Sequence, residues 1–182
     1  MTRTAVLLRH VSAEARTRGL WIAGGSDPDA DPDALAVLRP ALAELAHEHP
    51  PDRIICSPLK RACSTAALID HPAEIDERLR ERDFGAWEGR PTEECLAGID
   101  PEWMTSTARW LEMPIPGAET VAAVVARTAE LWADLVCDPA SCVWCVGHAG
   151  SLFGLVAAAR ALPLAEVWQT PLPRGGWIVV NR

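Results

Sequence analysis

The sequence has little positive charge. Its 182 residues contain 25 Asp and Glu against 17 Lys and Arg, which gives a formal net charge of −8 at pH 7. Sixteen of the basic residues are arginines, and Lys60 is the single lysine. This balance argues against a nucleic-acid-binding protein that relies on a basic surface, so we expect no nucleic-acid partner. Any site for an anion has to gather positive charge locally.

Long hydrophobic runs are also missing. The best candidate, residues 152–161, is short and contains Arg160, so no segment approaches the length of a membrane-spanning helix. At the N-terminus an apolar strand begins within the first few residues, which leaves no space for the hydrophobic region and cleavage site of a signal peptide. We therefore expect no membrane partner and a cytoplasmic location.

The six cysteines are then expected to stay reduced. Cys142 and Cys145 have a Cys-x-x-Cys spacing, which can indicate a metal or redox site. Here the two flank Val143-Trp144 in a predicted strand, where residues three apart point to opposite faces. The pattern predicts two buried thiols and no metal site.

Strand-like and helix-like segments alternate along the chain. Apolar strands are predicted at residues 4–8, 53–56, 142–146 and 177–180, with a weaker one at 74–77. Apolar residues three and four positions apart predict helices over Asp33 to His47, with Asp33 near the cap, and over Val121 to Leu135, and further helices should follow Pro58 and Ala149. No linker is visible. We predict one domain, residues 1–182, with an α/β fold: a three-layer α/β/α sandwich on a mainly parallel sheet.

Three of the predicted strands end in residues suited to binding an anion. Arg9 and His10 follow the first strand, Arg61 lies in the first turns of the helix after the second, and His148 follows the strand at 142–146. Ligands bind beyond the carboxyl ends of parallel strands, and helix N-termini add unpaired N–H groups and a positive dipole end. Together these loops suit a bound phosphate.

A fourth segment, residues 79–89, supplies carboxylates. Glu81, Asp83 and Glu88 lie in a loop that also contains glycine, Phe84 and Trp87. One of the carboxyl groups is a candidate proton donor, and spacing alone does not say which.

Four motifs in this order and at plausible spacing make the chain resemble the histidine phosphatase superfamily, which has the phosphoglycerate-mutase-like fold. The motifs are Leu8-Arg9-His10, Cys56-Ser57-Pro58-Leu59 with Arg61-Ala62 and Thr65-Ala66, Glu81 with Phe84-Gly85 and Trp87-Glu88-Gly89, and Gly147-His148. The resemblance covers nearly the whole chain, whereas any one motif alone would be weak.

The resemblance implies a role for each matching residue. His10 would be the nucleophile and form a phosphohistidine, while Arg9, Arg61 and His148 would bind the phosphoryl oxygens. Glu81 would protonate the leaving alkoxide and later take a proton from water. The implied activity is a metal-independent phosphomonoesterase acting on a small phosphorylated metabolite, with no metal and no cofactor.

The sequence departs from the family pattern just after His10. Val11 stands where the motif has glycine, and a valine would be strained if the loop needs a left-handed residue there. Ser12 replaces an acidic residue, and Arg16 and Arg18 occupy the neighbourhood of a family asparagine. Ser12 or Arg16 is expected to substitute in phosphate binding.

Residues 91–116 interrupt the alternation of strands and helices and are predicted to form a partial cover over the site. An apolar pocket for the leaving group could be walled by Trp21, Trp103, Met104 and Trp110, or these side chains could be core. In the Pro116 to Thr120 turn, the resemblance brings Glu119 near the site; the alternative is a carboxylate at a helix start.

The resemblance leaves the substrate open. The small size and the turn at residues 24–27 look like the α-ribazole phosphatase branch of cobalamin synthesis. A broad-specificity phosphatase or a phosphoglycerate-mutase-type enzyme is the alternative, and a catalytically inactive phospho-ligand binding homologue is the rival of another class. Either a monomer or a homodimer is compatible with the sequence.

Overall fold

The computed structural model describes residues 3–14 and 17–182, and within them it has a five-stranded sheet. The strands are β1 (Thr4–Arg9), β2 (Arg53–Cys56), β3 (Ala73–Ile75), β4 (Cys142–Gly147) and β5 (Trp177–Asn181), in the spatial order β3-β2-β4-β1-β5. All neighbours pair in parallel except β5, which runs antiparallel to β1. The mainly parallel sheet is confirmed.

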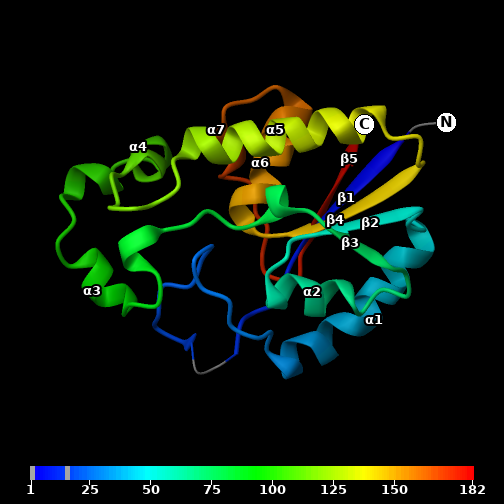
Figure 1. Cartoon of the computed structure of the whole chain (residues 1–182), viewed down its shortest axis with the longest axis horizontal. Helices are drawn as coiled ribbons and strands as arrows, with labels where there is room; N and C mark the ends of the chain where they lie inside the picture. Colours follow the sequence, from blue (N-terminus) through cyan, green and yellow to red (C-terminus); the bar gives the residue numbers. More distant parts are fainter. Residues whose placement is uncertain (1–2, 15–16) are drawn as a thin grey trace.

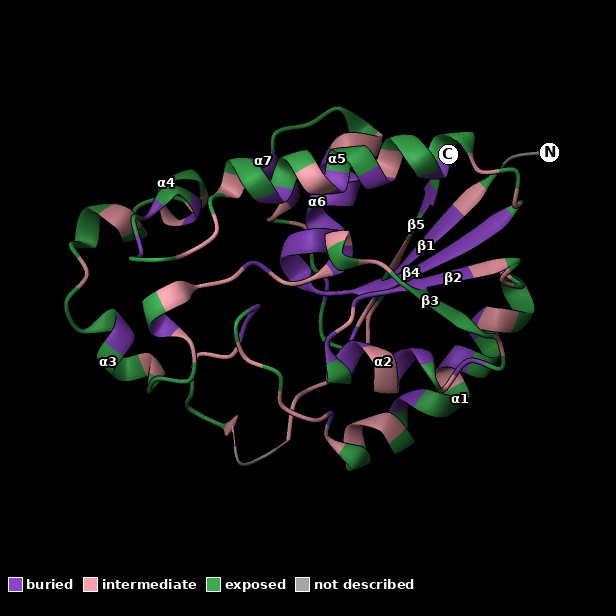
Figure 2. Cartoon of the chain, in the orientation of Figure 1, coloured by how far each residue is buried: buried purple, intermediate pink, exposed green. Residues whose placement is uncertain are grey.

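Helices cover both faces of this sheet (Figure 1). On one face lie α1 (Pro32–Glu48) and α2 (Lys60–Ala66), and on the other α5 (Val121–Cys137), α6 (Ala149–Arg160) and α7 (Leu164–Val167). The strands supply alternate side chains to the two cores: Cys145 packs with α5 and α6, and Cys142 packs with α1. The three-layer sandwich is confirmed, and the two cysteines occupy opposite faces as predicted. The central strands β1, β2 and β4 and the inner faces of the helices are the most buried part of the described chain, whereas the edge strand β3 is exposed (Figure 2).

Several predicted ends differ from the structure by one or two residues, and two predicted elements, the helix at 33–47 and the strand at 74–77, start one residue late. Helix α1 has its N-cap at Asp31, whose carboxylate accepts hydrogen bonds from the amides of Asp33 and Ala34, and Pro32 takes the first helical position. Proline is favoured there because its missing N–H would have no helical partner. The weak strand predicted at 74–77 is Ala73–Ile75, and Glu77 begins a short 3₁₀ turn that Asp76 caps.

A smaller third core lies beside the sandwich. It is built around the short helices α3 (Thr92–Leu96) and α4 (Thr107–Glu112) and the 3₁₀ turns Gly85–Trp87 and Pro101–Met104. Its aromatic centre comes from Trp21, Phe84, Trp87 and Trp110, with ring centroids 4.7–6.4 Å apart. These rings hold the 81–89 segment against the loop after β1.

The antiparallel direction of β5 matters for the site. Parallel strands β1, β2 and β4 end at one edge of the sheet, and β5 starts at that same edge, with Trp177 paired to Leu8. The loop before β5 therefore reaches the ligand-binding edge together with the loops that follow the parallel strands. In the described ranges, no helix has both the length and the hydropathy needed to cross a membrane.

Candidate active site

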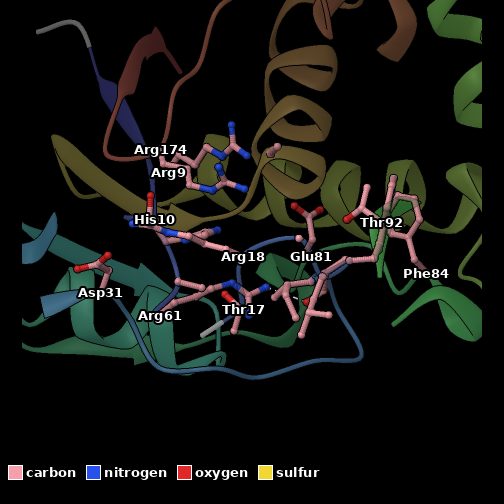
Figure 3. Close-up of a pocket in the computed structure, with 18 of the residues that line it drawn as sticks. Arg9, His10, Thr17, Arg18, Asp31, Arg61, Glu81, Phe84, Thr92 and Arg174 are labelled. Carbon is pink, nitrogen blue, oxygen red and sulfur yellow. Dashed lines mark hydrogen bonds between the residues drawn. The ribbon is translucent and has the colours of Figure 1, made fainter. Parts of the chain in front are cut away.

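A cavity of about 660 Å³ opens at the carboxyl edge of β1. Its walls come from the end of β1, the loop after it, α2, the 81–84 segment, the start of α6 and the loop before β5. Figure 3 shows Arg9, His10, Arg61 and Glu81 gathered around it. With Ser12, five of the predicted site residues therefore line one cavity.

The imidazole of His10 is buried, with 6% of its surface exposed. Its Nδ1 makes a short hydrogen bond with the backbone carbonyl of Val11. A carbonyl only accepts, so Nδ1 carries the proton and Nε2 keeps its lone pair. Burial, and next the positive charge of Arg61, hold the pKa of His10 well below its usual value. The ring is thus neutral at pH 7, in the tautomer a nucleophile needs.

Arg9 and Arg61 are fixed by backbone carbonyls instead of carboxylates. Nη1 of Arg9 donates to Leu172 O at 2.7 Å, and the two Nη atoms of Arg61 donate to Ser26 O at 3.0 Å and Ala23 O at 2.8 Å. Burial lowers the pKa of both guanidiniums, which still remain charged. The Nε of Arg9 is buried and has no hydrogen-bond partner in the part of the chain that is described.

His148 lies beside His10 but is completely buried. The two ring centroids are 4.7 Å apart, and Nε2 of His148 is 2.9 Å from Ser57 Oγ. Its Nδ1 finds no partner among the described residues. Burial, and next His10, lower the pKa of His148 well below the usual value. A phosphoryl dianion beside the two rings would act in the opposite direction, by favouring the charged form.

Of the three carboxyl groups in the 81–88 segment, Glu81 is the one that borders the cavity, and the other two have other partners. Glu88 accepts hydrogen bonds from the amides of Ala23, Gly25 and Phe84, and from Ser26 Oγ. Asp83 accepts from the amide of Gly85 at 2.7 Å. The carboxylates of Glu88 and Asp83 therefore stabilise the conformation of the loops that they bind.

The carboxylate of Glu81 accepts from the amides of Arg82 and Gly150, at 2.9 and 3.0 Å. Burial raises the pKa of Glu81, against these hydrogen bonds and the charge of Arg9 and Arg61. The close approach of Glu81 to α6 requires glycine at position 150, because a Cβ there would lie 2.3 Å from Glu81 Oε1.

The helix N-termini near the cavity are partly used by the protein itself. The amide of Lys60, at the start of α2, donates to Asp27 Oδ1 at 2.7 Å, and the amide of Gly150 in α6 donates to Glu81. Carboxylates of the chain thus take positions that the sequence suggested for phosphate.

Comparison with known proteins places this geometry in a family. The model of the histidine phosphatase superfamily (branch 1) matches residues 5–182. The chain belongs to the histidine phosphatase superfamily. It is 28% identical over 180 residues to the adenosylcobalamin/alpha-ribazole phosphatase of Salmonella typhimurium, a match that covers 96% of this chain and 88% of that one.

Two further relatives are glucosyl-3-phosphoglycerate phosphatases. The one from Mycolicibacterium vanbaalenii is 31% identical over 177 residues, covering 89% of this chain and 76% of its own. A mycobacterial enzyme of that name, solved with VO3, superimposes with a TM-score of 0.79 at 26% identity, over 97% of this chain and 92% of the other.

Val11, which stands in place of the motif glycine, causes no backbone strain. Val11 does not have a positive φ, its side chain is buried in the core with Val6 and Leu8, and its amide donates to Thr65 Oγ1 at 3.2 Å. The expected conflict between valine and a left-handed conformation therefore does not arise. Ser12 lines the cavity, whereas Arg16 lies outside the described residues.

Sequence reasoning missed Arg174, which lines the cavity next to Arg9 (Figure 3). It lies in the Pro-Arg-Gly-Gly loop before β5, and that loop reaches the site because β5 is antiparallel. An arginine flanked by turn residues at the start of the last strand was the available signal. Arg18, named only as a departure, also lines the cavity.

The aromatic wall is only partly as expected. Trp21 and Trp110 line the cavity together with Phe84 and Trp168. Trp103 packs in the third core and does not line it, and Met104 is 58% exposed. Glu119 does not line it either: it pairs with Arg127 at 2.7 Å beside a smaller cavity that Glu81 also borders.

The two buried neutral histidines predict a pH-dependent stability. In the unfolded chain both imidazoles take up protons near pH 6.5, whereas in the folded chain their pKa values lie well below it. Below that pH the unfolded state binds more protons, so the free energy of unfolding should fall as pH drops from 7 to 5, by about 1–2 kcal/mol per histidine. Urea unfolding at the two pH values measures this.

Matched variants assign the effect. His10→Gln and His148→Gln should each lose less stability between pH 7 and pH 5, because glutamine takes up no proton. His47→Gln, at an exposed position of α1, should keep the full dependence. An unchanged dependence in both buried-site variants would contradict the neutral state of these rings.

Proposed function

We propose that the chain is a metal-independent phosphomonoesterase that works through a phosphohistidine at His10. The observation that supports this most is the neutral His10 ring, with its Nδ1–H held by Val11 and two arginines and a carboxyl group around the same cavity. Such a ring presents an unprotonated Nε2 to phosphorus while the arginines neutralise the phosphoryl oxygens.

The first step transfers the phosphoryl group to the enzyme. The lone pair of Nε2 forms the N–P bond as the P–O bond to the leaving group breaks. Arg9 and Arg61 bind the equatorial oxygens, whose charge they match with fork-shaped donors. Glu81, whose raised pKa keeps a proton on the carboxyl group to higher pH, gives that proton to the leaving oxygen.

The second step releases phosphate. Glu81, now a carboxylate, takes a proton from a water molecule whose oxygen attacks phosphorus, and the N–P bond breaks to restore neutral His10. His148 gains a proton more easily when the phosphoryl dianion is present, and we assign it the stabilisation of that dianion beside His10. Ser12 and residues 91–116 complete the proposed site, the latter as a partial cover to which Thr92 and Trp110 contribute lining side chains.

The substrate is a small phosphorylated metabolite. α-Ribazole 5′-phosphate is a candidate because a relative is named for it and because aromatic side chains wall one part of the cavity. Relatives named for glucosyl-3-phosphoglycerate and phosphoserine make phosphorylated acids the other candidates.

Phosphate release from a panel of phosphomonoesters, with a chelator present, tests the proposal. We expect turnover of at least one ester in chelator and background release from His10→Ala. Phosphate binding without turnover of any ester by the folded protein would favour an inactive phospho-ligand binding homologue, and dependence on an added metal would reject the mechanism.

The role of Glu81 predicts a dependence on the leaving group. An alkoxide needs a proton to depart and p-nitrophenolate does not, so Glu81→Gln should slow enzyme phosphorylation by about 10²–10⁴ with an alkyl phosphate and far less with p-nitrophenyl phosphate. Burst-phase kinetics separate this step from hydrolysis of the phosphoenzyme, which needs Glu81 as a base with either ester.

Asp83→Asn is the matched control, because asparagine can still accept the hydrogen bond from Gly85 that Asp83 accepts. It should retain near wild-type phosphorylation rates with both esters. Equal losses for the two esters in Glu81→Gln, or a larger alkyl-selective loss in Asp83→Asn, would show that Glu81 is not the acid.

A further inference from the structure

The cavity holds more positive charge than a transferred phosphoryl group requires. Arg18 and Arg174 line it in addition to Arg9 and Arg61, and both are exposed to solvent. Each is without a hydrogen bond or an ion pair to any described residue. In the same cavity, Arg61 is fixed by two carbonyls and Arg9 by one.

Arg174 is held close to the nucleophile by its backbone. The amide of the next residue, Gly175, donates to the carbonyls of Arg9 and His10, both at 3.1 Å, and the amide of Arg9 donates to Gly176 O at 2.9 Å. Gly175 has φ +75°, and a Cβ there would meet Leu38 at 3.4 Å, so glycine suits this turn. The loop therefore presents Arg174 from a fixed position beside the end of β1.

Charge balance indicates what these arginines bind. A phosphoryl dianion is matched by Arg9 and Arg61. The carboxyl groups that line the cavity, Asp31 and Glu81, accept hydrogen bonds from backbone amides and pair with neither Arg18 nor Arg174, so these two guanidiniums remain facing the same space. The proximity of Arg174 to the other cations is unfavourable without an anion, because Arg174 contributes to lowering the pKa of Arg9, His10 and Arg61. Arg18 and Arg174 are exposed, whereas Arg61 is only 2% exposed. Arg18 and Arg174 therefore face the part of a bound substrate that lies nearer the mouth of the cavity.

We propose that Arg174, with Arg18, forms a subsite for a second oxyanion, such as a carboxylate, on the leaving group of the phosphomonoester. This inference rests on the proposed function, in which His10 takes the phosphoryl group. It favours phosphorylated acids over esters of an uncharged alcohol such as α-ribazole. The aromatic side chain of Phe84 lies at the other end of the cavity, away from Arg174 (Figure 3).

Two esters of similar size test the subsite. 3-Phosphoglycerate and glycerol 3-phosphate are both alkyl phosphates, and they differ in a carboxylate against a hydroxymethyl group. We expect wild-type kcat/KM to be at least about ten-fold higher for 3-phosphoglycerate, since hydrogen bonds to a charged group are the strong ones. Arg174→Gln should lower kcat/KM for 3-phosphoglycerate by about ten-fold or more and change that for glycerol 3-phosphate by less than about three-fold.

Arg160→Gln is the control for loss of one positive charge. Arg160 is exposed at the end of α6 and forms no ion pair with a described residue, so this variant should keep the wild-type preference. Equal losses for both esters in Arg174→Gln would overturn the inference, because Arg174 would then serve the phosphoryl group. No preference in the wild type would overturn it as well.

Failure of the proposed function can be distinguished from failure of the subsite. If the wild type turns over neither ester, calorimetric titration with each ester tests the subsite without chemistry. Tighter binding of 3-phosphoglycerate, lost in Arg174→Gln and kept in Arg160→Gln, would support the subsite in a protein that is not a phosphatase. Equal binding of the two esters would reject it.

Discussion

The site depends on keeping a histidine neutral inside a cluster of positive charge. Burial removes the water that would solvate an imidazolium, and Arg61, Arg9 and Arg174 make a further positive charge on His10 unfavourable. In the proposed mechanism, the same arginines attract the phosphoryl dianion. One arrangement of charges would then bind the substrate and maintain the lone pair that attacks it, while the carbonyl of Val11 determines which ring nitrogen carries that lone pair.

The sheet brings these charges together at low conformational cost. β1, β2 and β4 end at one edge, and β5 begins there, so residues far apart in sequence meet at that edge. Gly150 lets Glu81 approach α6, and the third core holds the 81–89 segment against the loop after β1. Fixed donors of this kind stabilise developing charge without reorganisation during the reaction, which is why rigid elements suit this chemistry.

Much of the fold and part of the site can be read from the sequence. Apolar strands that end in Arg9-His10 and Gly147-His148 show which residues reach the edge, because parallel strands share their direction. Spacing does not separate Glu81 from Asp83 and Glu88, since all three accept hydrogen bonds from backbone amides and only the folded loop places Glu81 alone of the three at the cavity. Arg174 could not be placed at the site from the sequence, because the pattern of an edge strand does not reveal whether that strand runs parallel or antiparallel to its neighbour. Whether Val11 would be strained could not be decided from the sequence, because the backbone conformation after His10 is set together with the packing of Val11 against Val6 and Leu8.

The central claim concerns one atom, Nε2 of His10. The phosphoenzyme formed with an alkyl phosphate can be trapped by rapid quenching into alkali, in which phosphohistidine survives better than in acid. Phosphorus–nitrogen correlation NMR of the trapped, ¹⁵N-histidine-labelled protein then identifies the bonded nitrogen. The account predicts phosphorus on Nε2 of His10; phosphorus on Nδ1, on His148 or on a residue other than histidine would contradict it.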